Sequence, residues 1–241
     1  YVALNVSDLP RSAAWYRSVV GLKPSERTSD GSVHFDVGTN RDGLLLFQSL
    51  RPGLKRIGWE LEDATQISVL GTHIERHGLT WQTLAREDCD AIRARAGVRL
   101  FEPITGAVLD FYVPDARPLD ERATTDIVNM QHLGHVVLAT PRYREAVRFY
   151  TDVLNFKTSD EIDGRINLMR CFPNPFHHSF GIAHAARNTF HHLNLMVTNE
   201  DDLSSARQRF AEHRVPIVWQ GTHPPSGNTF LFFLDPDGLS L

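Results

Sequence analysis

The sequence has few cysteines, no long apolar run and no large excess of charge of either sign. Its two cysteines, Cys89 and Cys171, lack CxxC spacing, which argues against a disulfide framework or a thiolate zinc site and favours a reducing, cytoplasmic compartment. The longest apolar stretches, such as residues 136–139 and 230–234, are far shorter than the roughly 18 residues of a transmembrane helix. We therefore expect no membrane partner.

The charge balance also narrows the range of partners. A formal net charge of −4 and a pI near 6.3 do not fit a nucleic-acid surface, which needs clustered Lys and Arg. A small molecule is the expected partner. With 41% hydrophobic and 22% charged residues, the 241 residues have the composition of a globular protein with one large domain or two small ones.

An internal repeat organises the chain. The segment YVALNVSDL that begins at Tyr1 aligns with HVVLATPRY at His135, and WYRSVVGL (15–22) aligns with FYTDVLNF (149–156). Both alignments have the same offset of 134 residues. A constant offset between two strand-then-helix patterns indicates a duplicated fold.

Each half divides again, because IGWELED (57–63) and FHHLNLMV (190–197) each open a second strand-then-helix unit. Short strands punctuated by Gly, Pro, Asn and Asp follow each helix. The sequence therefore predicts an α+β protein with four βαβββ units of about 55 residues. We place the N-terminal domain at residues 1–118, a charged linker at 119–130 and the C-terminal domain at 131–241.

Four βαβββ units in pairs resemble the vicinal oxygen chelate superfamily, over essentially the whole chain. The resemblance implies that each pair of units forms an open, cup-shaped mixed sheet that can hold a metal. Glyoxalase I, bleomycin-resistance proteins and extradiol dioxygenases share this fold, so the fold alone does not select the chemistry.

One position of the four unit-opening strands is occupied by Tyr1, Trp59, His135 and His192. Only the C-terminal half offers imidazoles there, and neutral imidazole is a good ligand for Fe(II), Mn(II) or Zn(II). Neighbours in a strand point to opposite faces, and the repeat register selects His192 over His191. The alternative is that both are hydrogen-bonded core histidines without a ligand.

Two motifs of the C-terminal half resemble those of type I extradiol ring-cleaving dioxygenases: PNPFHHSFGIA (173–183) and GTHPPSGNTFLFFLDPDG (221–238). The resemblance implies two catalytic residues: His178 as the acid/base, and His223, which lines the substrate pocket and hydrogen-bonds the oxygen of the bound ring. A base with a near-neutral pKa suits proton transfer from a catechol hydroxyl. The alternatives are a surface histidine doublet and a plain hairpin loop.

The resemblance also implies a metal site with His135 and His192 as ligands, holding Fe(II) or, as the second choice, Mn(II). The third ligand of the family is acidic and lies four residues after the Gly of the D-P-x-G turn, here Gly238. That position falls just after Leu241, and we expect the sequence to be clipped at both ends. In the N-terminal half the matching position is Asp110.

The substrate pocket expected from the resemblance has an aromatic wall, although aromatic residues in strands are often plain core. One departure from the family is Phe232, which stands where the extradiol motif has Tyr, so a hydroxyl that would contact substrate is missing. The expected substrate-binding residues are Phe172, Phe176, His177, Phe180, Pro225 and Phe232.

The implied activity is extradiol cleavage of a small aromatic diol by O₂, in aromatic compound degradation, by a homo-oligomer. One alternative is an O₂-independent enzyme of the superfamily, such as a glyoxalase-type isomerase or a thiol transferase. The other is a non-catalytic binding protein, which the loss of the tyrosine at Phe232 favours. Metal content and O₂ uptake separate these classes.

Overall fold

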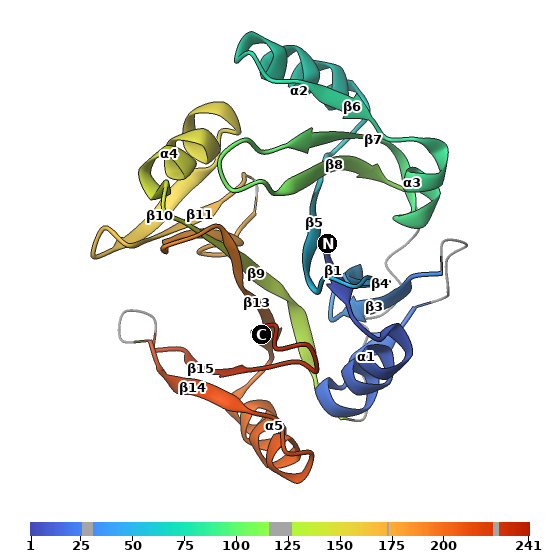
Figure 1. Ribbon diagram of the computed structural model, residues 1–241, viewed down its shortest axis with the longest axis vertical. Coiled ribbons are helices and arrows are strands. Elements are labelled where there is room, and N and C mark those ends of the chain that lie inside the picture. The colour runs from blue at the N-terminus through green and yellow to red at the C-terminus, as the bar shows by residue number, and fades with distance from the viewer. Residues whose placement is uncertain (26–30, 116–126, 173, 224–226) are drawn as a thin grey trace.

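The computed structural model describes residues 1–25, 31–115, 127–172, 174–223 and 227–241 (Figure 1). The N-terminal half forms an eight-stranded mixed sheet in the order β2-β3-β4-β1-β5-β8-β7-β6. Its strands are β1 (Val2–Val6), β2 (Lys23–Pro24), β3 (Val33–Val37), β4 (Asn40–Gln48), β5 (Gly53–Glu60), β6 (Trp81–Thr83), β7 (Ala94–Phe101) and β8 (Val108–Pro114). Its helices are α1 (Leu9–Trp15), η1 (Tyr16–Val20), α2 (Thr65–Arg76) and α3 (Arg86–Ala91).

The C-terminal half contributes a five-stranded sheet in the order β10-β11-β12-β9-β13 and the hairpin β14-β15. The strands are β9 (Met130–Thr140), β10 (Lys157–Ile162), β11 (Ile166–Arg170), β12 (Phe180–His184), β13 (Thr189–Val197), β14 (Ile217–Thr222) and β15 (Thr229–Phe233). The helices are α4 (Tyr143–Arg148), η2 (Phe149–Val153) and α5 (Glu200–Glu212). No helix among the described residues is long and apolar enough to span a bilayer.

Strand pairing repeats between the halves. Strand β1 is parallel to β4 and antiparallel to β5, and β9 is likewise parallel to β12 and antiparallel to β13. In both halves the first helix continues into a π-helical turn, η1 or η2. The predicted α+β class with open sheets is therefore confirmed. Residues 116–126, which include the predicted domain boundary, lie outside the described residues, and β9 already begins at Met130, the last residue of the predicted linker.

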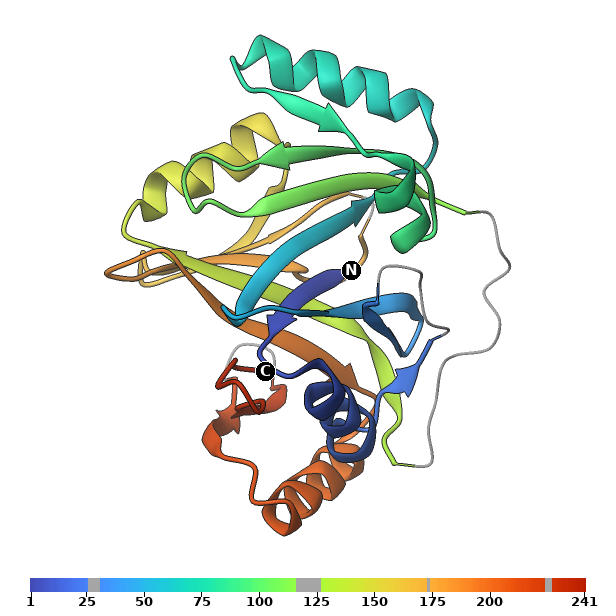
Figure 2. The same ribbon diagram turned by 45° about the vertical axis from the view of Figure 1, so that its right-hand side comes forward.

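The two halves contact each other through a turn of each half, and helix α1 lies beside the C-terminal end of the chain (Figure 2). The buried Tyr16 hydroxyl donates to Asp235 of the C-terminal D-P-D-G turn at 3.0 Å. In the opposite direction, the Asn188 side-chain amide donates to the carbonyls of Ile104 and Thr105 at 2.9 and 3.1 Å. After the D-P-D-G turn, the segment 239–241 runs beside β13, where the Leu193 amide donates to the Ser240 carbonyl at 3.1 Å.

Candidate metal centre

The imidazoles of His135 and His192 meet on adjacent strands. His135 lies in β9 and His192 in β13, and their Nε2 atoms are 3.0 Å apart with the rings nearly perpendicular. Two nitrogens that each lie about 2.1 Å from one divalent ion, at an angle of about 90°, are also about 3.0 Å apart. The spacing of this pair therefore fits two neighbouring positions in the coordination shell of one ion.

The protonation state of the pair suits metal binding. Burial lowers the pKa of His192 to about 3, with smaller effects from His191 and His178. Burial also holds the pKa of His135 well below its ordinary value, and the neighbouring histidines act in the same direction. Both rings are therefore neutral near pH 7, and a neutral ring keeps a lone pair for a cation. The donor set fits Fe(II), Mn(II) or Zn(II).

A third protein ligand is not found in the part of the chain that the structure describes, where no group of three or more His, Cys, Asp or Glu side chains could hold a metal. The acidic residue expected four positions after Gly238 stays a prediction. The segment that leads to that position, 239–241, runs beside β13, the strand that carries His192.

The ring of His191 touches the ring of its neighbour. Its Nδ1 lies 2.7 Å from Nδ1 of His192, so one ring donates to the other. When Nδ1 of His192 is the donor in this contact, its Nε2 carries no proton and keeps the lone pair that a metal needs. Of the two roles considered for His191, the geometry favours contact with His192 over a ring that points away.

The alignment of His192 with Trp59 is wrong. Cα pairing places His192 opposite Val137 and Arg56 opposite Ala3, so Arg56 is the structural counterpart of His192. The ring of Trp59 packs in the core against Phe156 and Phe180. The count failed because 53 positions separate Ala3 from Arg56 (56 − 3) whereas 55 separate Val137 from His192 (192 − 137), and a sequence pattern does not reveal this difference in the connecting segments.

The N-terminal cup is filled by an ion-pair network. The Tyr1 hydroxyl donates to the fully buried Asp110 at 2.6 Å, and Arg99 donates twice to the same carboxylate, at 2.7 and 2.8 Å. Arg56 lies 3.7 Å from Asp110 and 3.4 Å from Asp88. The three side chains at the positions of the predicted metal ligands, Tyr1, Arg56 and Asp110, are thus already engaged, because Tyr1 and Arg56 both contact the carboxylate of Asp110.

His178 joins the histidine pair from the segment before β12. Its ring lies 4.4 Å from the ring of His135, and its Nδ1 is 3.0 Å from Nδ1 of His177. Burial, and then the neighbouring His177 and His223, lower the pKa of His178 to about 4, while Asp160 acts in the opposite direction. The structure therefore brings His178 to the predicted metal ligand His135, while His223 is linked to the group only through its electrostatic effect on His178.

The predicted aromatic wall is only partly assembled at the histidines. Phe232 lies 4.7 Å from His192, and Phe176 stacks on the buried His132 at 4.1 Å. Phe172 is 86% exposed. The prediction for Phe180 is corrected, because its side chain is completely buried in the core with its ring 4.3 Å from that of Tyr150.

Pro225 lies outside the described residues. The sequence argument missed His132, Asp160 and Trp219. His132 lies three residues before His135, a spacing that puts two side chains of a regular strand on opposite faces, so no simple pattern links them.

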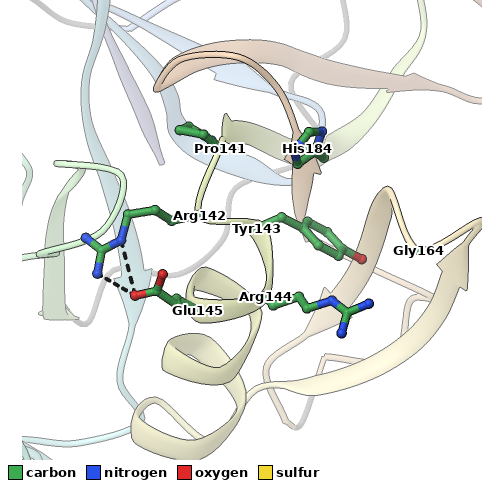
Figure 3. A pocket seen from close by; sticks show the side chains of 7 residues that line it. All are labelled: Pro141, Arg142, Tyr143, Arg144, Glu145, Gly164 and His184. Carbon is green, nitrogen blue, oxygen red and sulfur yellow. Dashed lines mark hydrogen bonds and ion pairs between the residues drawn. The ribbon is translucent and has the colours of Figure 1, made fainter.

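A cavity of about 300 Å³ opens elsewhere, at the start of α4 (Figure 3). The ion pair between Arg142 and Glu145, at 2.5 Å, stands at its rim. None of the histidines described above lines this cavity, so it is separate from the candidate metal centre. Its lining residues are Pro141, Arg142, Tyr143, Arg144, Glu145, Gly164 and His184.

Comparison with known proteins agrees with this architecture. The model of the Glyoxalase/Bleomycin resistance protein/Dioxygenase superfamily matches residues 1–99 and 132–241, and the chain belongs to this superfamily. The biphenyl-2,3-diol 1,2-dioxygenase of Paraburkholderia xenovorans (strain LB400) is 24% identical over 100% of this chain and 85% of its own length. The resemblance to extradiol dioxygenases is thereby confirmed.

Two solved structures show the same fold. A halotolerant catechol dioxygenase superposes with a TM-score of 0.88 and 22% identity, over 100% of this chain and 83% of the other. A Mn(II)-bound glyoxalase from Novosphingobium aromaticivorans superposes with a TM-score of 0.83 and 24% identity, over 100% and 79%. At these identities the likeness shows the fold alone, and one fold serves both chemistries.

Proposed function

We propose that the protein is an extradiol dioxygenase that opens a catechol-type ring with O₂ at a single Fe(II) or Mn(II) ion. The observation that carries the proposal is the convergence of three neutral imidazoles, His135, His192 and His178, from three separate segments. Relatives that bear this activity in their names support the same reaction class.

In this proposal His135 and His192 would hold the ion through Nε2, together with the acidic residue that the resemblance implies four positions after Gly238. Such an ion would supply Lewis acidity and open coordination positions for a bidentate diol and O₂. The neighbouring His191 holds the ring of His192 in the orientation that leaves Nε2 available.

His178 moves the protons. Its lowered pKa, about 4, keeps the ring neutral at pH 7, so it can accept the proton of a diol hydroxyl and return it as the ring opens. The carbon–carbon bond beside the diol breaks, and both atoms of O₂ enter the product, a ring-opened semialdehyde with one aldehyde and one carboxylate. Phe232 adds an apolar face beside His192 and no hydrogen bond.

The test is an oxygen-electrode and absorbance assay of the full-length protein, loaded anaerobically with Fe(II), against catechol and its 3- and 4-substituted derivatives. We expect O₂ uptake with a yellow product, none from His192→Ala because its metal is lost, and a slowed rate from His178→Gln with iron retained. If the protein at full iron occupancy consumes no O₂ with any of these diols, the proposal is wrong.

A second candidate is an O₂-independent enzyme or a binding protein on the same scaffold. Phe232 favours it, because the phenolic hydroxyl of the extradiol motif is absent. A solved structure with the same fold is named a Mn(II)-bound glyoxalase, which supports this candidate. Bound metal without O₂ uptake, combined with turnover of a glutathione hemithioacetal, would select the isomerase.

A further inference from the structure

A row of aromatic rings leads away from His192 along the hairpin β14-β15. The ring of Phe232 lies 4.7 Å from His192, and Trp219 stacks on Phe232 at 5.3 Å with an interplanar angle of 26°. Phe230 meets the edge of Trp219 at 4.7 Å. Trp219 pairs with Phe232 across the hairpin, so the aromatic row (Trp219, Phe230 and Phe232) shares one face of it.

This surface is open to solvent at its outer end. Trp219 is 62% exposed, whereas Phe232 and Phe230 are half-buried. Tryptophan is mostly buried in folded proteins. An exposed apolar surface that continues into a functional site is typical of a surface that a bound ligand covers. The aromatic row begins at a predicted metal ligand, so the ligand that would cover it is one already held at that centre. The rings of the aromatic row carry no charge, so a planar apolar group on a bound ligand would stack on them.

We propose that Trp219 is a specificity-determining residue, whose ring binds a planar apolar substituent on the diol ring of the substrate. This inference rests on the proposed function, because it takes the diol to be held at His135 and His192. The substituent extends past Phe232 and stacks on the exposed indole.

The kinetic test compares 3-phenylcatechol with unsubstituted catechol in the full-length, iron-loaded protein. For Trp219→Ala we expect kcat/KM for 3-phenylcatechol to fall about tenfold, because the substitution removes a stacking contact and the apolar area that it buries. The kcat/KM for catechol should change little. Trp219→Phe should restore much of the loss. Val218→Ala is the matched control, because Val218 is adjacent, 56% exposed and carries no ring. Equal losses for both diols, or no loss for either, overturn the inference.

A binding measurement separates this inference from the proposed function. Anaerobic 3-phenylcatechol should quench tryptophan fluorescence in the metal-loaded protein, and Trp219→Phe should remove most of the quenching. If quenching depends on Trp219 but no diol is cleaved, the proposed function fails and the inference stands. If the diols are cleaved but binding and quenching are unchanged in Trp219→Phe, the inference fails and the function stands.

Discussion

The two cups of this protein have the same strand pairing but differ in the side chains at the positions of the predicted metal ligands. In the N-terminal cup, the positions of the predicted ligands hold Tyr1, Arg56 and Asp110, and the carboxylate of Asp110 contacts Tyr1, Arg56 and also Arg99. In the C-terminal cup, His135 and His192 face each other with no counter-charge among the described residues that could complete a metal site. Charged groups that are paired with one another have no donor atom left for a metal, whereas clustered neutral imidazoles keep lone pairs that can bind a cation.

Mutations in the two cups are expected to change different properties of the protein: folding stability in the N-terminal cup and metal content in the C-terminal cup. Breaking the N-terminal network leaves a buried charge without a partner, which lowers the free energy of unfolding. Removing an imidazole from the C-terminal cup is expected to change the metal content and to leave folding nearly intact, because under the proposed function it removes a metal ligand.

The largest expected effect is on metal content. His192→Ala should lower anaerobic iron binding from about one ion per chain to a small fraction of that, because one ligand of a minimal set is lost. Arg56→Ala, at the matching position of the other cup, should leave the iron content unchanged. Equal iron loss in both variants would contradict the assignment of the metal to the C-terminal cup.

The second effect is on stability. Arg99→Ala should lower the free energy of unfolding by about 3 kcal/mol, because the buried carboxylate of Asp110 loses its bidentate partner. Urea denaturation measures the change. The control is Arg86→Ala, whose ion pair with Asp90 is exposed and should contribute less than about 1 kcal/mol. A change as small as that of the control would show that the network does not stabilise the cup.

The third effect is a pH dependence of the metal-free protein. The pKa of His178 is about 4 in the folded chain and about 6.5 when unfolded, so the unfolded state takes up its proton first as the pH falls. Above about pH 6.5 this group does not lower the free energy of unfolding. Between about pH 6.5 and about pH 4 it lowers that free energy progressively, by up to roughly 3 kcal/mol. His178→Gln should flatten the curve over this interval. Parallel curves for the two proteins would contradict the lowered pKa.

The smallest effect concerns His191. His191→Ala should weaken metal binding about tenfold, because the ring of His192 loses the contact at its Nδ1. A competition titration with a metal-binding dye measures the affinity. His213→Ala, at the end of α5, should have no effect. An unchanged affinity in His191→Ala would show that the contact does not orient the ligand.

The sequence predicted the repeat well, because the strand-then-helix patterns of Tyr1 and His135 and of Tyr16 and Tyr150 are separated by the same 134 residues. It also selected histidines that the structure brings together. Inside a repeat unit it was less reliable, since the segments that connect the paired strands differ in length between the halves, and this put Trp59 in the place of Arg56.

The sequence also did not predict which aromatic residues are buried. Phe180 and Trp219 are both large aromatic residues in strands, yet the first is fully buried and the second is 62% exposed. The difference depends on which distant segments pack over each ring, for example Tyr150 over Phe180, and a local pattern contains no information about those contacts.

The central claim is that His135 and His192 bind one divalent ion. Iron K-edge X-ray absorption of the full-length protein, titrated anaerobically with Fe(II), tests it most directly because it counts imidazole ligands. We predict one iron per chain with two imidazoles, and one imidazole fewer in any iron that His135→Ala retains. Iron without imidazole scattering, or two imidazoles that persist in His135→Ala, would contradict the claim.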